Sequence, residues 1–238
     1  MSIEKSRIRE LVWNRLSEAG VARFPLPPHG RIPNFVGAEE AGARIASLEI
    51  FIEAEVIKVN PDSPQRYIRE IVLREGKRLI MPTPRLKKGF LLLDGGLLRG
   101  RERYASTIRG AFRLGRIVPP NKLPPVDFIV EGSVAVGLDC SRLGKGEGYA
   151  ELEYGILREL GLVDDDTPIA TTVHELQIFK SLPQDPFDVP VDIIATPKRL
   201  IRPKCGRAKP KGIYWDMLSM EKLREIELLR DLKTMLGK

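Results

Sequence analysis

The spacing of apolar side chains predicts several amphipathic helices along the chain. Within residues 4–19, Ile8, Leu11, Val12 and Leu16 recur at helical intervals, and charged residues occupy the opposite face. Each such helix needs an apolar surface to pack against, because its hydrophobic stripe is unstable in water. The same spacing predicts further helices at residues 37–46, 65–75, 149–160 and 220–236.

Short apolar runs, rich in β-branched residues, lie between the predicted helices. Such runs are typical of strands buried on both faces, as in a parallel sheet. Because strands and helices alternate, we expect an α/β fold with a mainly parallel sheet, formed by a single domain over residues 1–238. The runs occupy residues 55–59, 77–81, 127–130, 133–136, 168–173 and 191–195, with 213–217 as a candidate for a last strand.

The composition is that of an ordinary globular protein, with 42% hydrophobic and 30% charged residues. No apolar run approaches the ~18 residues that a membrane-spanning helix needs. The first ten residues mix charges of both signs, so we expect no signal peptide. Cys140 and Cys205 stand alone, without a C-x-x-C motif or a metal-binding spacing. We therefore expect a reducing, cytoplasmic location and no membrane association.

The net charge of +7 favours anionic partners such as nucleotides, polyglutamates or nucleic acid. Residues 198–211 hold seven cations and no anion. A run of this kind usually forms a solvated loop, although it could also contact phosphate or nucleic acid. Tyr214 and Trp215 follow the run, and they could stack on a base or pack into the core.

The most informative motif is the glycine-rich stretch at residues 142–149, which reads Arg-Leu-Gly-Lys-Gly-Glu-Gly-Tyr. Its three alternating glycines let the backbone approach a ligand closely, and Arg142 and Lys145 add positive charge. A predicted helix follows at once, and helix N-termini favour phosphate oxygens. The spacing matches neither the dinucleotide motif nor the P-loop. By itself, the stretch indicates either a phosphate-binding loop or a flexible turn that caps the helix.

Further motifs accompany the glycine loop in a fixed order, at residues 31–35, 81–86, 134–136, 142–150, 188–192 and 196–197. On these motifs the chain resembles the 5-formyltetrahydrofolate cyclo-ligase family, also called methenyltetrahydrofolate synthetases. Within that family it is most similar to the methenyltetrahydrofolate synthetase domain-containing subgroup. The resemblance implies a three-layer α/β/α sandwich with a mainly parallel sheet.

The resemblance also implies an ATP- and Mg²⁺-dependent ligase that acts on 5-formyltetrahydrofolate or a related pterin. In such enzymes ATP phosphorylates the formyl oxygen, which turns a poor leaving group into a good one. N10 of the folate then attacks the activated carbon, closes the ring of the 5,10-methenyl form and releases phosphate. The protein's task is positioning and charge neutralisation.

Matching the family motifs position by position places the nucleotide contacts on the first helix and the glycine loop. Lys5 and Arg9 match a Lys-x-x-x-Arg motif, and their spacing puts both cations on one helix face. Arg142 and Lys145 are the expected catalytic cations, which neutralise phosphate charge. The full expected set of nucleotide-binding residues is Lys5, Arg9, Arg142, Gly144, Lys145, Gly146, Glu147, Gly148 and Tyr149.

Two carboxylates, Glu151 and Asp188, match the family's Mg²⁺ ligands. Hard oxygen ligands suit Mg²⁺, which usually binds through one or two carboxylates together with phosphate and water. The chain departs from the family pattern at Ala150, where relatives carry a second tyrosine, and at Phe187, where they often carry histidine. The acidic residue that holds the pterin after an early strand finds no obvious match within residues 58–64.

A second function remains open from the sequence. A non-catalytic nucleotide- or RNA-binding protein on the same fold would also use the net positive charge and the basic run at residues 198–211. No aromatic motif of the RNA-recognition type occurs in the chain. We therefore expect a small-molecule ligase first and a nucleic-acid-binding protein second.

Overall fold

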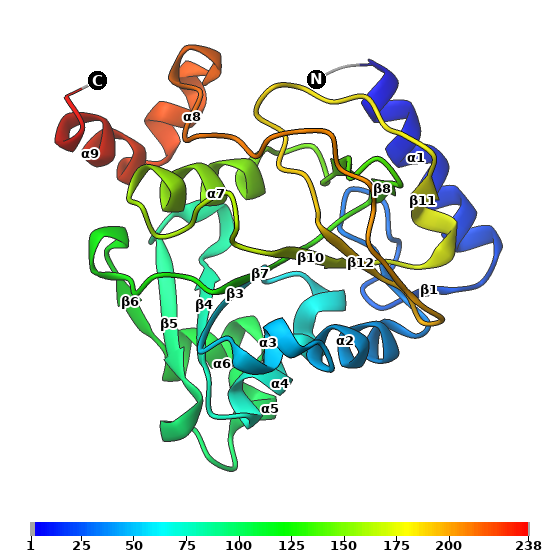
Figure 1. Ribbon diagram of the computed structural model, residues 1–238, viewed down its shortest axis with the longest axis horizontal. Helices are drawn as coiled ribbons and strands as arrows, with labels where there is room; N and C mark the ends of the chain where they lie inside the picture. Colours follow the sequence, from blue (N-terminus) through cyan, green and yellow to red (C-terminus); the bar gives the residue numbers. More distant parts are fainter. Residues whose placement is uncertain (1–2, 238) are drawn as a thin grey trace.

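An eight-stranded sheet runs through the molecule, and its central part is parallel (Figure 1). The computed structural model describes residues 3–237. Strands β12, β10, β7, β3 and β4 pair in parallel, while β13, β5 and β6 each pair antiparallel with the preceding neighbour. In spatial order the strands are β13 (Leu200–Ile201), β12 (Ile193–Ala195), β10 (Ile169–Thr172), β7 (Phe128–Glu131), β3 (Val56–Val59), β4 (Arg78–Pro82), β5 (Phe90–Asp94) and β6 (Arg116–Val118).

Helices cover both faces of this sheet, as the alternation of patterns predicted (Figure 1). One face is covered by α2 (Ala38–Ala46), α3 (Glu49–Glu53), α4 (Arg66–Arg74), α5 (Glu102–Ala105) and α6 (Ile108–Leu114). The other face is covered by α7 (Tyr149–Glu159), α8 (Met220–Glu225) and α9 (Glu227–Met235). Because each face has its own buried apolar cluster, the central strands are apolar on both sides. The predicted α/β fold with a mainly parallel sheet is confirmed.

The N-terminal helix α1 (Ile3–Glu18) packs apart from the main sheet. Its buried Val12 and Leu16 share an apolar cluster with Val134 and Leu143. The cluster lies against a small sheet of β8 (Ala135–Gly137), β9 (Arg142–Leu143) and β11 (Ile178–Phe179). A short hairpin-like pair, β1 (Ala22–Arg23) and β2 (Asn34–Phe35), completes this region. The arrangement carries α1 to the start of the glycine loop.

The last forty residues depart from the sequence prediction in two ways. The expected strand at 213–217 is wrong, because Trp215–Met217 forms a single 3₁₀ turn. The edge of β12 that a further strand would need is already paired with β13. The expected helix at 220–236 is broken at Ile226, whose extended backbone separates α8 from α9.

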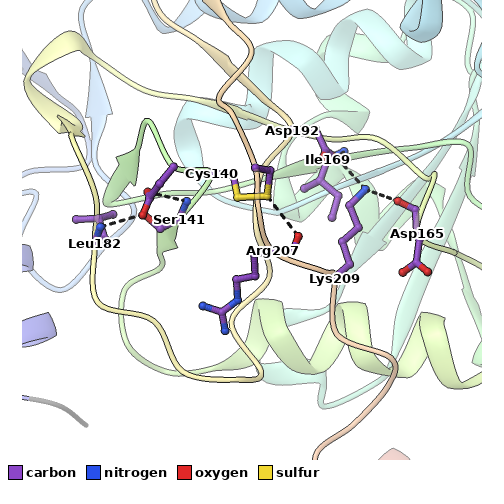
Figure 2. Close-up of a disulfide and its surroundings, with 10 residues drawn as sticks. Cys140, Ser141, Asp165, Ile169, Leu182, Asp192, Arg207 and Lys209 are labelled. Carbon is purple, nitrogen blue, oxygen red and sulfur yellow. Dashed lines mark hydrogen bonds and ion pairs between the residues drawn. A yellow bond between two sulfur atoms is a disulfide. The ribbon is translucent and has the colours of Figure 1, made fainter.

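Cys140 and Cys205 form a disulfide, so the expectation that they stand alone is wrong (Figure 2). Their sequence separation of 65 hides a Cα–Cα distance of 5.2 Å, which the fold creates by returning the chain after β13 to the turn between β8 and β9. The expectation of a reducing compartment rested on unpaired cysteines and stays a prediction. Within residues 3–237, the helices are too short or too polar to cross a bilayer.

Candidate functional site

A cavity of about 940 Å³ opens at the carboxyl ends of β3 and β7. The chain leaves β3 through α4 toward β4, and it leaves β7 through α7 toward β10 on the other side. At such a switch point the two connections diverge and leave a crevice, which is the usual ligand site of open α/β sheets. All of the predicted site residues line this cavity: Lys5, Arg9, Arg142, Gly144, Lys145, Gly146, Glu147, Gly148, Tyr149, Glu151 and Asp188.

The glycine loop connects β9 to α7 and forms one wall of the cavity. Gly146 and Gly148 adopt left-handed conformations, with φ of 103° and 71°, which a residue with a Cβ rarely takes. Gly148 is also the N-cap of α7. Within the described part of the chain, the amides of residues 144–148 donate to no protein acceptor. The loop therefore offers free N–H groups at a helix N-terminus, an arrangement that suits phosphate oxygens.

Arg142 is buried beneath the loop and is held by several groups. Its Nη1 donates to the Gly132 carbonyl at 2.9 Å, and its Nη2 is paired with the Glu151 carboxylate. Burial alone would lower the pKa of Arg142, but the neighbouring carboxylates, Glu151 foremost, raise it above its usual value. The guanidinium is thus a fixed positive charge that also orients Glu151.

Helix α1 brings two further cations to the cavity, on the single face that the i,i+4 spacing predicted. Lys5 pairs with Asp188 and, at 2.7 Å, with Asp185. Arg9 donates from Nε to the Gly144 carbonyl at 2.7 Å, which ties the helix to the glycine loop. The Nη1 of Arg9 is buried and has no hydrogen-bond partner among residues 3–237. Burial lowers the pKa of Arg9, a cost that a bound anion would offset.

Each of the two predicted metal ligands already holds a cation, since Glu151 pairs with Arg142 and Asp188 pairs with Lys5. Among residues 3–237, no group of three or more His, Cys, Asp or Glu side chains is arranged to hold a metal ion. Two cavity-lining carboxylates nevertheless fit the usual coordination of Mg²⁺, which takes its remaining ligands from phosphate and water.

Two charged residues of the glycine loop form an ion pair that is open to solvent. Lys145 pairs with Glu147 at 2.7 Å, and both side chains are partly exposed.

Sequence reasoning missed a buried ionic cluster beside the cavity. Lys58 of β3 lies 2.7 Å from Glu131 of β7 and 2.6 Å from Glu153 of α7. Asn60 donates to Glu153 at 2.8 Å, and one oxygen of Glu131 has no hydrogen-bond partner in the part of the chain that the structure describes. Burial raises the pKa of Glu153 to about 7, although Lys58 opposes the shift. The sequence did carry a signal for this cluster: Lys58 lies within one apolar run and Glu131 ends another. Because charged side chains are rarely buried without a partner, two such residues could have been expected to pair.

Comparison with known proteins identifies the family. The sequence profile of the 5-formyltetrahydrofolate cyclo-ligase family matches residues 3–197. The chain belongs to this family. It is 41% identical over 237 residues to the mouse methenyltetrahydrofolate synthase domain-containing protein, and 40% identical over 234 residues to the zebrafish protein of that name. These matches cover 97% and 96% of the chain, but only 63% and 61% of the two relatives.

A solved structure is similar to the whole arrangement. The NMR structure of 5,10-methenyltetrahydrofolate synthetase from Aquifex aeolicus superposes with a TM-score of 0.55 at 25% identity. The superposition covers 86% of this chain and 95% of the Aquifex chain. The cyclo-ligase family membership and the observed sandwich therefore agree.

The structure also offers a candidate for the acidic residue that the family motif left unplaced. Asp62 follows β3 by three positions and lines the cavity, as do Asn60 and Glu153. Burial raises the pKa of Asp62, while the cations of Lys145 and Arg69 oppose the shift. Asp62 is therefore a candidate for the acidic position that the resemblance implied after an early strand.

The C-terminal segment supplies a wall that lies outside the region matched by the cyclo-ligase profile. Eight residues of this segment line the cavity: Gly212, Ile213, Tyr214, Met217, Leu218, Ser219, Glu221 and Lys222. Three of the seven cations in the preceding basic run are engaged within the protein: Arg207 with the Asp185 carbonyl, Lys209 with Asp192 and two carbonyls, and Lys211 with Asp165 (Figure 2 shows Lys209 near Asp165). The solvated-loop interpretation is therefore wrong for the buried Lys209, whereas the side chain of Lys211 stays well exposed, as a solvated loop predicts. A nucleic-acid contact through the other cations stays a prediction.

Proposed function

We propose that this protein is an ATP- and Mg²⁺-dependent cyclo-ligase that converts 5-formyltetrahydrofolate, or a closely related reduced pterin, to its 5,10-methenyl form. One observation above all supports the proposal. A buried guanidinium nitrogen of Arg9 lacks a partner beside a glycine loop whose amides lack acceptors. An anion with several oxygens, such as a triphosphate, would satisfy both sets of donors at once.

The chain's residues divide the work of the reaction. The amides of residues 144–148 and the side chains of Arg9 and Lys145 would hold the triphosphate and neutralise the charge that spreads over the transferred phosphoryl group. The formyl oxygen attacks the γ-phosphorus, and ADP leaves. N10 then attacks the formyl carbon, the carbon–oxygen bond breaks, and phosphate departs while N10 loses its proton. Because both steps need alignment more than covalent help, fixed groups such as the buried Arg142 suit the task.

Asp188 and Glu151 are the side chains that would hold Mg²⁺, which shields phosphate charge when it is bound. Both carboxylates are paired with cations, so metal binding would have to share them with Lys5 and Arg142. This sharing keeps the site close to neutral when it is empty. It also links the N-terminal helix to the occupancy of the metal site.

The reduced pterin would be held at the acidic side of the cavity. Asp62 and Glu153 are acceptors there, and the amide of Asn60 fixes the Glu153 carboxyl. A pteridine ring presents N–H groups that pair well with carboxylates. The cavity of about 940 Å³ is large enough for a nucleotide and a second small molecule.

The test is a spectroscopic assay. Purified protein, ATP and Mg²⁺ are mixed with 5-formyltetrahydrofolate, and we expect methenyl absorbance to grow with release of one ADP and one phosphate for each ring closed. Omitting ATP or Mg²⁺ should abolish the signal, as should Asp188→Asn. The exposed Asp216→Asn, outside the cavity, is the matched control and should behave as wild type. Ring closure without ATP, or ATP binding without any ring closure, would contradict the proposal.

A further inference from the structure

Three aromatic side chains line the cavity among the described residues: Tyr149, Phe187 and Tyr214. Both the ring and the hydroxyl of Tyr149 already contact other side chains of the protein. The ammonium of Lys222 lies 3.2 Å from the centre of its ring, and its hydroxyl donates to Glu225. Burial, followed by the hydrogen bond to Glu225, raises the pKa of that hydroxyl to about 12. Tyr149 therefore acts mainly as a fixed contact between the glycine loop and α8.

Phe187 and Tyr214 differ from Tyr149, because their principal ring contact is with each other. Their ring centres are 6.4 Å apart at an angle of 65°, which is an edge-to-face arrangement. In such a contact the edge of one ring meets one face of the other. Tyr214 is 38% exposed and Phe187 is half-buried, and both line the cavity. The pair thus presents aromatic surface to a ligand.

The position of Tyr214 is fixed from both sides. The amide of Ile213 and the indole nitrogen of Trp215 both donate to the Glu159 carboxylate of α7, at 3.2 and 3.1 Å. Ile213 is buried and Trp215 is half-buried against the core, so the intervening Tyr214 remains at the cavity. From the sequence, both neighbours could stack on a base or pack into the core, and the structure packs only Trp215 against the core. A ring held in this way loses little entropy when it stacks on a ligand.

Phe187 ties this aromatic surface to the phosphate end of the cavity. It directly precedes Asp188, whose carboxylate holds Lys5 of α1. A planar ring resting on the pair would therefore lie close to the cations that face the glycine loop. A nucleotide carries such a ring on its phosphates, whereas the acidic residues Asp62 and Glu153 suit the second substrate.

We propose that the Phe187–Tyr214 pair is the stacking platform for the base of the bound nucleotide. The inference rests on the nucleotide of the proposed function and adds the site of its base. Tyr214 lies beyond residue 197, where the match to the family profile ends. The C-terminal segment therefore contributes one of the two rings, and Phe187, within the matched region, contributes the other.

The experiment compares two ligands that share phosphates but differ in the base. Binding of ATP and of inorganic tripolyphosphate, each with Mg²⁺, is measured by calorimetry for wild type, Tyr214→Leu and Tyr214→Phe. We expect Tyr214→Leu to bind ATP roughly five- to a hundredfold more weakly, as is usual for loss of a base-stacking ring, with unchanged affinity for tripolyphosphate. Tyr214→Phe should retain ATP binding, because the ring remains.

A matched control is available in Tyr104→Leu, since Tyr104 is 40% exposed and lies outside the cavity. It should bind both ligands as wild type does. Unchanged ATP affinity in Tyr214→Leu would overturn the inference, as would an equal loss of affinity for tripolyphosphate. Failure of the wild-type protein to bind either phosphate ligand would instead overturn the proposed function and the inference with it.

Discussion

The glycine loop and the C-terminal segment both line the same cavity, yet they reach it by different means. The loop at residues 142–151 is local: its glycines, its cations and the helix that follows are neighbours in sequence. The segment at residues 198–222 is placed by distant partners, through a disulfide to Cys140, a lysine on Asp192 and two hydrogen bonds to Glu159. A short sequence motif can predict a segment of the first kind, whereas the position of the second depends on residues that are distant in sequence.

The largest effect is expected when the disulfide that anchors the C-terminal segment is removed. Cys205→Ser opens a loop of 65 residues, and loop-closure entropy then predicts a loss of about 4 kcal/mol in the free energy of unfolding. Urea unfolding with and without a thiol reductant measures the effect. Reductant should lower the stability of wild type to that of the variant and leave the variant unchanged. Equal stability of both proteins without reductant would refute the anchoring role.

The next test removes a cation from the loop without disturbing the fold. Lys145 is partly exposed and forms an ion pair with the exposed Glu147, so Lys145→Ala should leave stability within about 0.5 kcal/mol of wild type. Loss of a charge that faces the transferred phosphoryl group should lower the rate of ring closure about a hundredfold. The exposed Lys204→Ala, in the basic run, is the control and should keep full activity. Equal loss in both variants would mean that overall charge, and not position, matters.

A third test concerns the buried cluster beneath both walls. Glu153 has a pKa of about 7 when folded against an ordinary value of 4.5, so between these pH values the folded protein holds a proton that the unfolded chain has released. Its contribution to stability therefore falls as pH rises through that window, by at most about 1.4 kcal/mol per pH unit, and levels off above it.

Chemical unfolding between pH 5 and 8 measures this slope. Glu153→Gln should remove the corresponding part of the pH dependence, whereas Glu53→Gln, at an exposed position of α3, should reproduce the wild-type curve. A curve for Glu153→Gln that runs parallel to wild type would show that Glu153 does not titrate in this range.

The smallest effect on stability is expected from the exposed ion pair of the C-terminal segment. Lys211 and Asp165 form an ion pair in which both side chains are well exposed. Exposed pairs are screened by water, so Lys211→Ala should cost less than about 1 kcal/mol of stability and leave nucleotide binding unchanged. Thermal melting with and without ATP provides the measurement. A larger loss would assign this residue to the anchoring that we ascribe to Cys205 and Lys209.

The same contrast explains how far the sequence could lead. The apolar runs predicted where the parallel strands lie. The four-residue spacing of Lys5 and Arg9 predicted that both side chains lie on one face of α1. The disulfide could not be foreseen, because nothing near Cys140 or Cys205 records that the chain returns to the same turn. The ion pair of Lys58 with Glu131 escaped notice for a related reason, since the two residues meet only through the alignment of β3 with β7.

The ion pair between Lys5 and Asp188 joins residues 183 positions apart. During translation, Lys5 of the first helix therefore cannot pair with Asp188 until most of the chain has been synthesised. Contacts between residues so far apart in sequence also form slowly, because closing a long loop costs chain entropy. The nucleotide of the proposed function would bind only the finished site and would not guide the early stages of folding. ATP added to a refolding mixture should therefore raise the yield without quickening the first phases.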